Sequence, residues 1–170
     1  MSLWHGWAVS LLLIQSTPLG LGVTWSTQYF QQKVDHFNHQ NPATFKQKYL
    51  VATDFWDSST GPVFFYTGNE APIETAVLTA NVGLMVDLAP QFRALLIRAE
   101  HRYYGDSKPF GPVNSFNSSN VGYLTSEQAL ADYATLILGV KPLYDAALAP
   151  VIAFGGSYGA LLSAWIRLKY

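Results

Sequence analysis

The chain contains no cysteine among its 170 residues, which excludes disulfide bonds and thiolate-bound metal sites. Charged residues are also scarce: they make up 12% of the composition, and the formal net charge is −1. This balance offers no basic surface of the kind that nucleic acids need, so we expect no nucleic-acid partner. Hydrophobic residues make up 49% and aromatic residues 15%, a composition typical of a globular domain with a sizeable core.

The N-terminal segment lacks Asp, Glu, Lys and Arg until Lys33. Its apolar run, Ala8 to Ile14, is too short to span a membrane, and we expect no membrane span. Gly20 and Gly22 supply small residues at positions −3 and −1 of a cleavage site. The segment therefore predicts a secretory signal peptide over residues 1–22, although its first residues lack the usual positive charge. The alternative is a buried N-terminal strand or helix.

A glycosylation sequon, Asn117-Ser118-Ser119, lies in a loop rich in serine and asparagine. In a secreted chain such a loop is accessible to the glycosylation machinery. We therefore expect a glycan on Asn117.

Strand-like and helical patterns alternate along the rest of the chain. Strands are expected at 29–37, 48–56, 63–66, 93–99 and 151–154. A first helix is expected at 78–89, and Pro90 would end it. A second is expected to begin at a capping box formed by Thr125 and Gln128, and a third is expected after Gly159. Alternation of this kind predicts an α/β fold with a mostly parallel sheet, built as one domain over residues 23–170.

The chain ends with a motif typical of a serine nucleophile. Gly155-x-Ser157-x-Gly159 follows a buried strand and opens a helix, which is the setting of a nucleophile elbow. The sharp turn would lift the Ser157 hydroxyl above the sheet, where the Tyr158 N–H could bind an oxyanion. The alternatives are an ordinary strand-to-helix turn and such a turn that binds phosphate.

The second oxyanion donor in such folds comes from the loop after an earlier strand. Here that loop carries Gly68 and Asn69, and its alternative role is to cap the next helix. His101 is not expected to be the catalytic base, because in elbow folds the histidine follows the serine in the chain. A structural hydrogen bond is its default role, and Glu100 with Arg102 suggests a partly buried ion pair. No metal or cofactor is implied.

Several longer stretches resemble the prolyl carboxypeptidase and dipeptidyl peptidase II family, with a slight lean to the first branch. The stretches are Tyr29–Phe37, Phe65–Glu70, Glu100–Gly105, Leu124–Asp132 and Gly155–Gly159. The resemblance covers about residues 28–170. It implies the N-terminal part of a lysosomal or secreted α/β-hydrolase that cleaves peptides with proline near a terminus. Ser157 aligns with the family's nucleophile, and the family's aspartate and histidine lie further downstream.

The chain departs from the family pattern at three places. Ala71-Pro72 replaces Gly-Asp in the proposed oxyanion loop, Ala160 replaces a glycine where it could crowd the helix, and Arg98 replaces an apolar strand residue. A charge buried at Arg98 would need a partner. Two other functions therefore stay open: a non-catalytic secreted fragment, and an esterase or lipase with the same elbow.

Overall fold

The computed structural model describes residues 22–78 and 83–170. The signal peptide expected over residues 1–22 therefore lies outside the described residues, apart from Gly22. So does part of the helix expected at 78–89.

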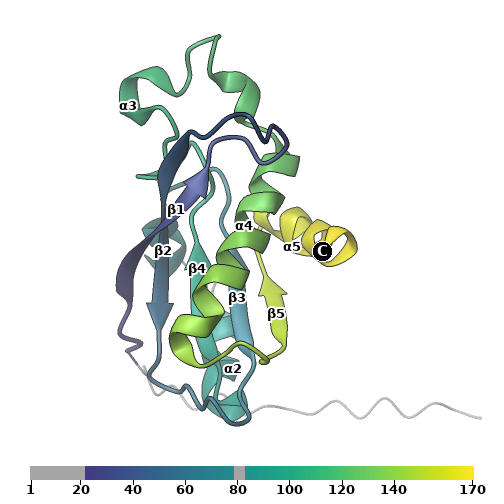
Figure 1. Cartoon of the computed structure of the whole chain (residues 1–170). Coiled ribbons are helices and arrows are strands. Elements are labelled where there is room, and N and C mark those ends of the chain that lie inside the picture. The colour runs from purple at the N-terminus through teal and green to yellow at the C-terminus, as the bar shows by residue number, and fades with distance from the viewer. Residues whose placement is uncertain (1–21, 79–82) are drawn as a thin grey trace, which may run out of the picture.

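The described residues form a five-stranded mixed sheet in the order β1-β2-β4-β3-β5 (Figure 1). The first two neighbouring pairs, β1 with β2 and β2 with β4, are antiparallel. The β3 strand is parallel to both β4 and β5, as the alternating pattern predicted. The strands are β1 (Ser26–Lys33), β2 (Thr44–Ala52), β3 (Val63–Thr67), β4 (Leu95–Ala99) and β5 (Val151–Phe154).

Helices connect the parallel strands and follow β5. The long helix α4 crosses one face of the sheet, and α5 extends from the end of β5 (Figure 1). Within the described ranges, no helix is long and apolar enough to cross a membrane. The helices are α1 (Ile73–Leu78), α2 (Gly83–Phe92), α3 (Gly111–Asn114), α4 (Ser126–Val140) and α5 (Tyr158–Lys169), with 3₁₀ turns η2 (Val121–Tyr123) and η3 (Lys141–Tyr144).

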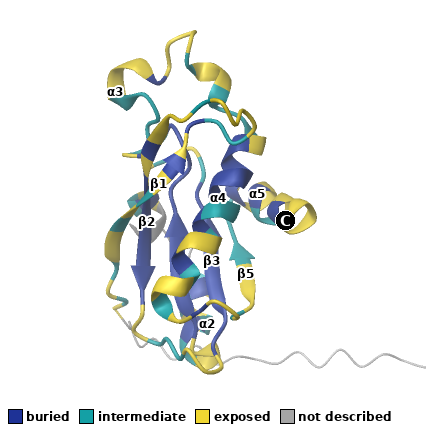
Figure 2. Cartoon of the chain, viewed as in Figure 1, coloured by how far each residue is buried: buried dark blue, intermediate teal, exposed yellow. Residues whose placement is uncertain are grey.

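The core occupies both faces of the sheet. Side chains alternate along each strand, so Phe65 and Ile97 pack with α4 and α5, whereas Phe64 and Leu96 pack against residues of α1 and α2. The central strands β3 and β4 are buried along their whole length, whereas β5 is partly exposed at the edge (Figure 2). A strand covered on both faces reads as a continuous apolar run, which is why these strands were visible in the sequence.

Several element boundaries differ from those expected. The first two strands begin and end about four residues earlier than predicted. The prediction that Pro90 ends its helix is wrong, because α2 continues to Phe92. The residue after the helix, Arg93, is left-handed with a φ of 53°, and the Ala94 N–H bonds to the Ala89 carbonyl. This is a Schellman motif, in which backbone bonds of the final turn terminate the helix.

The start of α4 matches only half of the predicted capping box. The Thr125 hydroxyl accepts the Gln128 N–H at 3.2 Å, as expected of an N-cap. The Gln128 side chain does not bond back to Thr125. Its amide nitrogen donates to Asp35, and its oxygen accepts the His36 N–H. The Gln128 side chain therefore bonds to residues distant in the sequence and not to its own N-cap.

Candidate active site

Ser157 lies on a strained turn between β5 and α5. Its φ of 53° and ψ of −128° lie outside the regions that non-glycine residues normally occupy. The residue is exposed, and its side chain makes no capping bond to the helix that it precedes. The hydroxyl is therefore presented to solvent at the carboxyl end of the parallel strands, as the elbow motif predicted.

The flanking glycines allow this turn to pack tightly. A Cβ on Gly155 would overlap the backbone of Gly159 and lie 2.7 Å from the Ser163 hydroxyl oxygen. A Cβ on Gly159 would lie 2.5 Å from the carbonyl oxygen of Thr67. Both distances are shorter than carbon–oxygen contacts allow, so these two positions need glycine. A Cβ on Gly156 would meet only the Tyr66 hydroxyl, at 3.5 Å.

Thr67 joins the elbow to the end of β3. Its hydroxyl lies 2.7 Å from the Gly159 carbonyl oxygen and 2.7 Å from the Ser163 hydroxyl. It also lies 3.1 Å from the Phe154 carbonyl oxygen. These contacts hold the start of α5 against the strand that leads into the second candidate loop.

That loop, the candidate oxyanion loop of residues 68–73, is held in place at its first peptide. The Gly68 N–H donates to the Ala99 carbonyl at 3.0 Å, and the Gly68 carbonyl accepts the Tyr133 hydroxyl at 2.9 Å. Complete burial raises the pKa of Tyr133 well above its ordinary value, so the hydroxyl keeps its proton and donates. The N–H groups of Asn69 and Tyr158 have no acceptor among the described residues.

Glu100 and Arg102 do not form the ion pair suggested by the sequence. The buried Glu100 carboxylate accepts the Ile73, Asp106 and Ser107 N–H groups and the Ser107 hydroxyl, at 2.7–3.0 Å. Burial raises the pKa of Glu100, and the bonds from Ser107 and Ile73 oppose that rise.

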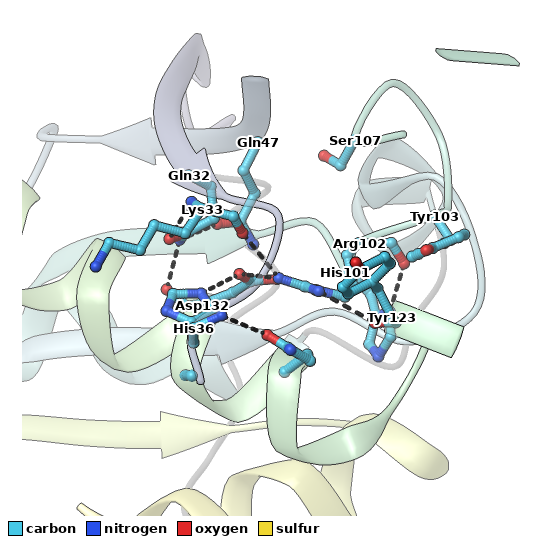
Figure 3. A network of polar contacts seen from close by, with 12 residues as sticks. Gln32, Lys33, His36, Gln47, His101, Arg102, Tyr103, Ser107, Tyr123 and Asp132 are labelled. Atoms are coloured by element: carbon cyan, nitrogen blue, oxygen red, sulfur yellow. Dashed lines mark hydrogen bonds and ion pairs between the residues drawn. The ribbon is translucent and has the colours of Figure 1, made fainter. Parts of the chain in front are cut away.

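Arg102 pairs instead with Asp132 on α4 (Figure 3). Two nitrogens of the guanidinium lie 2.7 Å from the two carboxylate oxygens, and both side chains are fully buried. His36 contacts the same carboxylate through Nε2 at 2.7 Å. The remaining Arg102 donors bond to the carbonyls of Lys33, Val34 and Tyr123. This network joins β1, the end of β4 and α4.

His101 is buried behind the elbow. Its Nδ1 lies 2.7 Å from the Arg102 carbonyl oxygen, so this nitrogen carries the proton and donates. Its Nε2 has no partner in the described structure, and the ring packs against the rings of Tyr104, Tyr133 and Tyr158. Burial lowers the pKa of His101. No hydrogen bond joins the Ser157 hydroxyl to a base in the described parts of the chain.

The Arg98 guanidinium packs on aromatic rings and pairs with no carboxylate among the described residues. Its guanidinium carbon lies 4.4 Å from the Trp25 ring centroid and 5.7 Å from that of Tyr66. The side chain is buried, and its Nε and Nη1 atoms have no hydrogen-bond partner within residues 22–78 and 83–170. Burial lowers the pKa of Arg98 to about 10. Ala160, by contrast, is exposed and does not crowd the helix.

Sequence reasoning missed the part that Thr67 and Tyr133 play in the site, and the pairing of Asp132 with Arg102, which lies outside it. Thr67 and Asp132 lie in stretches that carry the family resemblance, but those stretches assign them no partner, because each side chain acts on a residue far along the chain. Tyr133 was visible only on the apolar face of a helical segment. The described residues contain no group of three or more His, Asp or Glu side chains arranged to hold a metal ion.

Comparison with known proteins identifies relatives across most of the chain. Residues 32–170 match the family model described as Serine carboxypeptidase S28. Lysosomal Pro-X carboxypeptidase from Homo sapiens is 50% identical over 147 residues, which cover 86% of this chain and 29% of the relative. Thymus-specific serine protease from Homo sapiens is 35% identical over 84% of this chain and 27% of the relative. The chain thus spans less than a third of the length of these relatives.

Solved structures share the fold at low sequence identity. An α/β hydrolase from Novosphingobium aromaticivorans has a TM-score of 0.54 at 16% identity, covering 86% of this chain and 40% of that one. The peroxisomal α/β-hydrolase Lpx1 from Saccharomyces cerevisiae has a TM-score of 0.54 at 13% identity, covering 86% and 41%. The predicted fold, the N-terminal part of an α/β-hydrolase, is confirmed. Together with the family match, these findings establish that the chain belongs to the serine carboxypeptidase S28 family, on the side of prolyl carboxypeptidase.

Proposed function

We propose that this chain is the nucleophile-bearing part of a serine exopeptidase that cleaves peptides with proline near a terminus. The observation that carries the proposal is the backbone of Ser157, a non-glycine residue at φ 53° and ψ −128° between a parallel strand and a helix. Such strain persists only where the surrounding structure enforces it, and it is common at catalytic positions. The named substrate class of the relatives supports the choice of peptide, since one is a lysosomal Pro-X carboxypeptidase.

In this mechanism the Ser157 hydroxyl oxygen attacks the carbonyl carbon of the scissile peptide bond. A histidine takes the hydroxyl proton and then gives it to the leaving amine, as in other serine peptidases. The attack places a negative charge on the former carbonyl oxygen. The Tyr158 N–H, at the first turn of α5, is one donor for that oxyanion.

We assign the second donor to Asn69, and not to Gly68. The Gly68 N–H is already used by the Ala99 carbonyl, whereas the Asn69 N–H has no acceptor among the described residues. A trans peptide directs its C=O and N–H in opposite directions. Because Tyr133 holds the Gly68 carbonyl on the α4 side, the Asn69 N–H points away from α4.

We place the catalytic base outside the described residues. His101 is the histidine beside the elbow, but no hydrogen bond links it to Ser157, and aromatic rings surround it. This supports the expectation that the family's aspartate and histidine lie downstream. It also favours a second candidate function, in which this chain alone is not catalytic.

The compartment is part of the proposal. The relatives named lysosomal, together with the apolar segment before Val23, favour a chain that enters the secretory pathway and reaches the lysosome or the medium. Asn117 is exposed on a surface loop, as a glycan acceptor must be. Removal of N-glycans from material made in animal cells should lower its mass, and Asn117→Gln should abolish that change.

A chimaeric enzyme tests the activity. The chain would be joined after Tyr170 to the downstream part of human lysosomal Pro-X carboxypeptidase. We expect it to hydrolyse proline-containing peptides in preference to short acyl esters, and to react with a fluorophosphonate probe at Ser157. Ser157→Ala should abolish both. A folded chimaera that prefers esters would support an esterase or lipase, and one that labels elsewhere would refute the assignment of Ser157.

A further inference from the structure

The oxyanion loop, residues 68–73, is attached at both ends to two consecutive residues of the chain. Its first N–H, on Gly68, bonds to the carbonyl of Ala99, the last residue of β4. Its last N–H, on Ile73, bonds to Oε1 of Glu100 at 3.0 Å. Ile73 is also the first residue of α1, so the Glu100 carboxylate caps that helix from a distant part of the chain.

The other oxygen of Glu100 holds a second loop. Oε2 accepts the N–H groups of Asp106 and Ser107 and the Ser107 hydroxyl, at 2.7–2.9 Å. The loop between Glu100 and Ser107 carries His101 and Tyr104, and the His101 ring packs against Tyr158 of the elbow, with ring centroids 5.5 Å apart. Gly105, with φ +51°, leaves room for the carboxylate, since a Cβ there would overlap it.

We propose that Glu100 is a positioning residue of the candidate active site, which fixes the oxyanion loop relative to the Ser157 elbow. The inference rests on the proposed function for its catalytic consequence, but not for its structural one. Glu100 touches neither the nucleophile nor the position of the oxyanion. It acts by holding the loop that carries the Asn69 N–H.

The chemistry of the site requires a carboxylate. Four donors converge on two oxygens, and a carboxylate has acceptor sites for all of them. In Glu100→Gln the single carbonyl oxygen can take the place of only one carboxylate oxygen, so it serves either the Ile73 N–H or the donors of Asp106 and Ser107. The amide NH₂ group would then face N–H groups, which leaves buried donors unpaired. The oxyanion loop should lose its bond at Ile73, or the loop between Glu100 and Ser107 should lose its bonds at Asp106 and Ser107, or both losses should occur.

Asp132→Asn provides a matched control. It also converts a fully buried carboxylate to an amide, but Asp132 binds Arg102 and His36 and contacts no residue of the oxyanion loop through its side chain. Both variants should lower global stability. Only Glu100→Gln should act on residues 68–73 beyond that global change.

Hydrogen exchange on the 170-residue chain at micromolar concentration tests the structural part. We expect Glu100→Gln to speed amide exchange in a peptide covering residues 68–75 by ten-fold or more, beyond the increase in the central strands. Asp132→Asn should give no such local excess. If Glu100→Gln fails to fold, Ser107→Ala removes one donor and should give a smaller local increase at residues 106–107 and 73. Unchanged local exchange in the folded variants would overturn the inference.

Kinetics of the chimaera test the catalytic part. Removing one oxyanion donor costs about 10²–10³-fold in kcat in serine peptidases, so a misplaced donor should cost roughly ten-fold or more. We expect Glu100→Gln to lower kcat with KM changed less than about three-fold, whereas Asp132→Asn, corrected for folded protein, retains kcat. An inactive parent chimaera would count against the proposed function alone. An active parent whose Glu100→Gln variant keeps kcat and loop protection would overturn the role of Glu100.

Discussion

At the scale of single residues, Gly155 and Gly159 of the elbow have no room for a Cβ atom, whereas their neighbour Gly156 has. A Cβ at Gly159 would lie 2.5 Å from the Thr67 carbonyl oxygen, whereas one at Gly156 finds an ordinary 3.5 Å contact. We therefore predict that Gly159→Ala lowers the free energy of unfolding by about 1–3 kcal/mol, the usual cost of overpacking. Gly156→Ala should change it by much less. Urea denaturation of both variants measures the difference, and equal losses would contradict this account of the turn.

The two buried arginines, Arg98 and Arg102, should differ in their contribution to the free energy of unfolding. Arg98 has no anionic partner among the described residues and two unpaired nitrogens, whereas Arg102 is fully bonded to Asp132 and three carbonyls. Replacing an incompletely paired buried charge with an apolar residue is often neutral or stabilising. Arg98→Leu should therefore leave stability unchanged or raise it by about 1–3 kcal/mol.

Arg102→Leu should instead lower stability by about 3–5 kcal/mol, because it leaves the buried Asp132 carboxylate without its main partner. Thermal melts of the two variants decide the point. Comparable destabilisation by both would mean that the aromatic contacts of Arg98 stabilise the fold as strongly as a complete ion pair does.

His101 should contribute to the pH dependence of stability near neutral pH. Burial lowers its pKa from the ordinary value of 6.5 in the folded chain, so the unfolded chain binds the proton more readily. By linkage, this contribution to stability is fully present above pH 6.5 and declines as the pH falls below it. We predict a smaller loss of stability between pH 7.5 and pH 5 in His101→Gln than in the parent chain. Denaturant titrations at both pH values would show it, and equal losses would exclude His101 as the source.

At the scale of elements, β5 is an edge strand among the described residues, and it bears partly exposed apolar side chains. Val151 and Ile152 are 37% and 42% exposed, and a groove of about 570 Å³ lies beside them between α4 and α5. Unpaired, apolar edges promote association between chains, and a lysine placed on such an edge suppresses it. We predict that Ile152→Lys reduces concentration-dependent self-association of the 170-residue chain.

Leu148→Lys is the control for this prediction. Leu148 is 99% exposed and precedes β5, so the substitution makes the same change in charge but places the lysine outside the edge strand. Light scattering over a range of concentrations compares the two variants. Equal improvement by both would show that net charge, and not the β5 edge, governs association.

At the scale of the whole molecule, the proposed nucleophile Ser157 has no hydrogen-bonded base in the described parts of the chain. Loss of the base or the serine in a comparable triad lowers kcat by about 10⁶-fold. We predict that the 170-residue chain neither hydrolyses proline peptides nor reacts with a fluorophosphonate at the rate of the chimaera. Gel fluorescence after labelling measures this. Equal rates dependent on Ser157 would mean that a residue within this chain, with His101 the first to test, acts as base.

Much of the architecture was predictable because the relevant signals are local. Apolar runs marked β3, β4 and β5, and the glycine spacing around Ser157 marked the elbow, since a strained turn needs small residues next to it. Long motifs in the correct order also indicated the family. Predictions failed where a local motif competed with tertiary contacts: Gln128 bonds to Asp35 and His36 and not to its own N-cap, and α2 runs past Pro90 to a Schellman turn at Arg93.

The α/β class and the family follow from short-range patterns in the sequence, and so does the prediction that Ser157 is the nucleophile. The pairing of the buried polar groups follows from the tertiary structure alone. Glu100 and Arg102 are two residues apart, yet one anchors the oxyanion loop and the other binds Asp132 on α4. In the tertiary structure the Gly68 N–H bonds to the Ala99 carbonyl, whereas the Asn69 N–H has no acceptor among the described residues. Such pairings depend on which groups meet after the sheet has formed, and a buried polar group must take whichever partner the fold brings within reach.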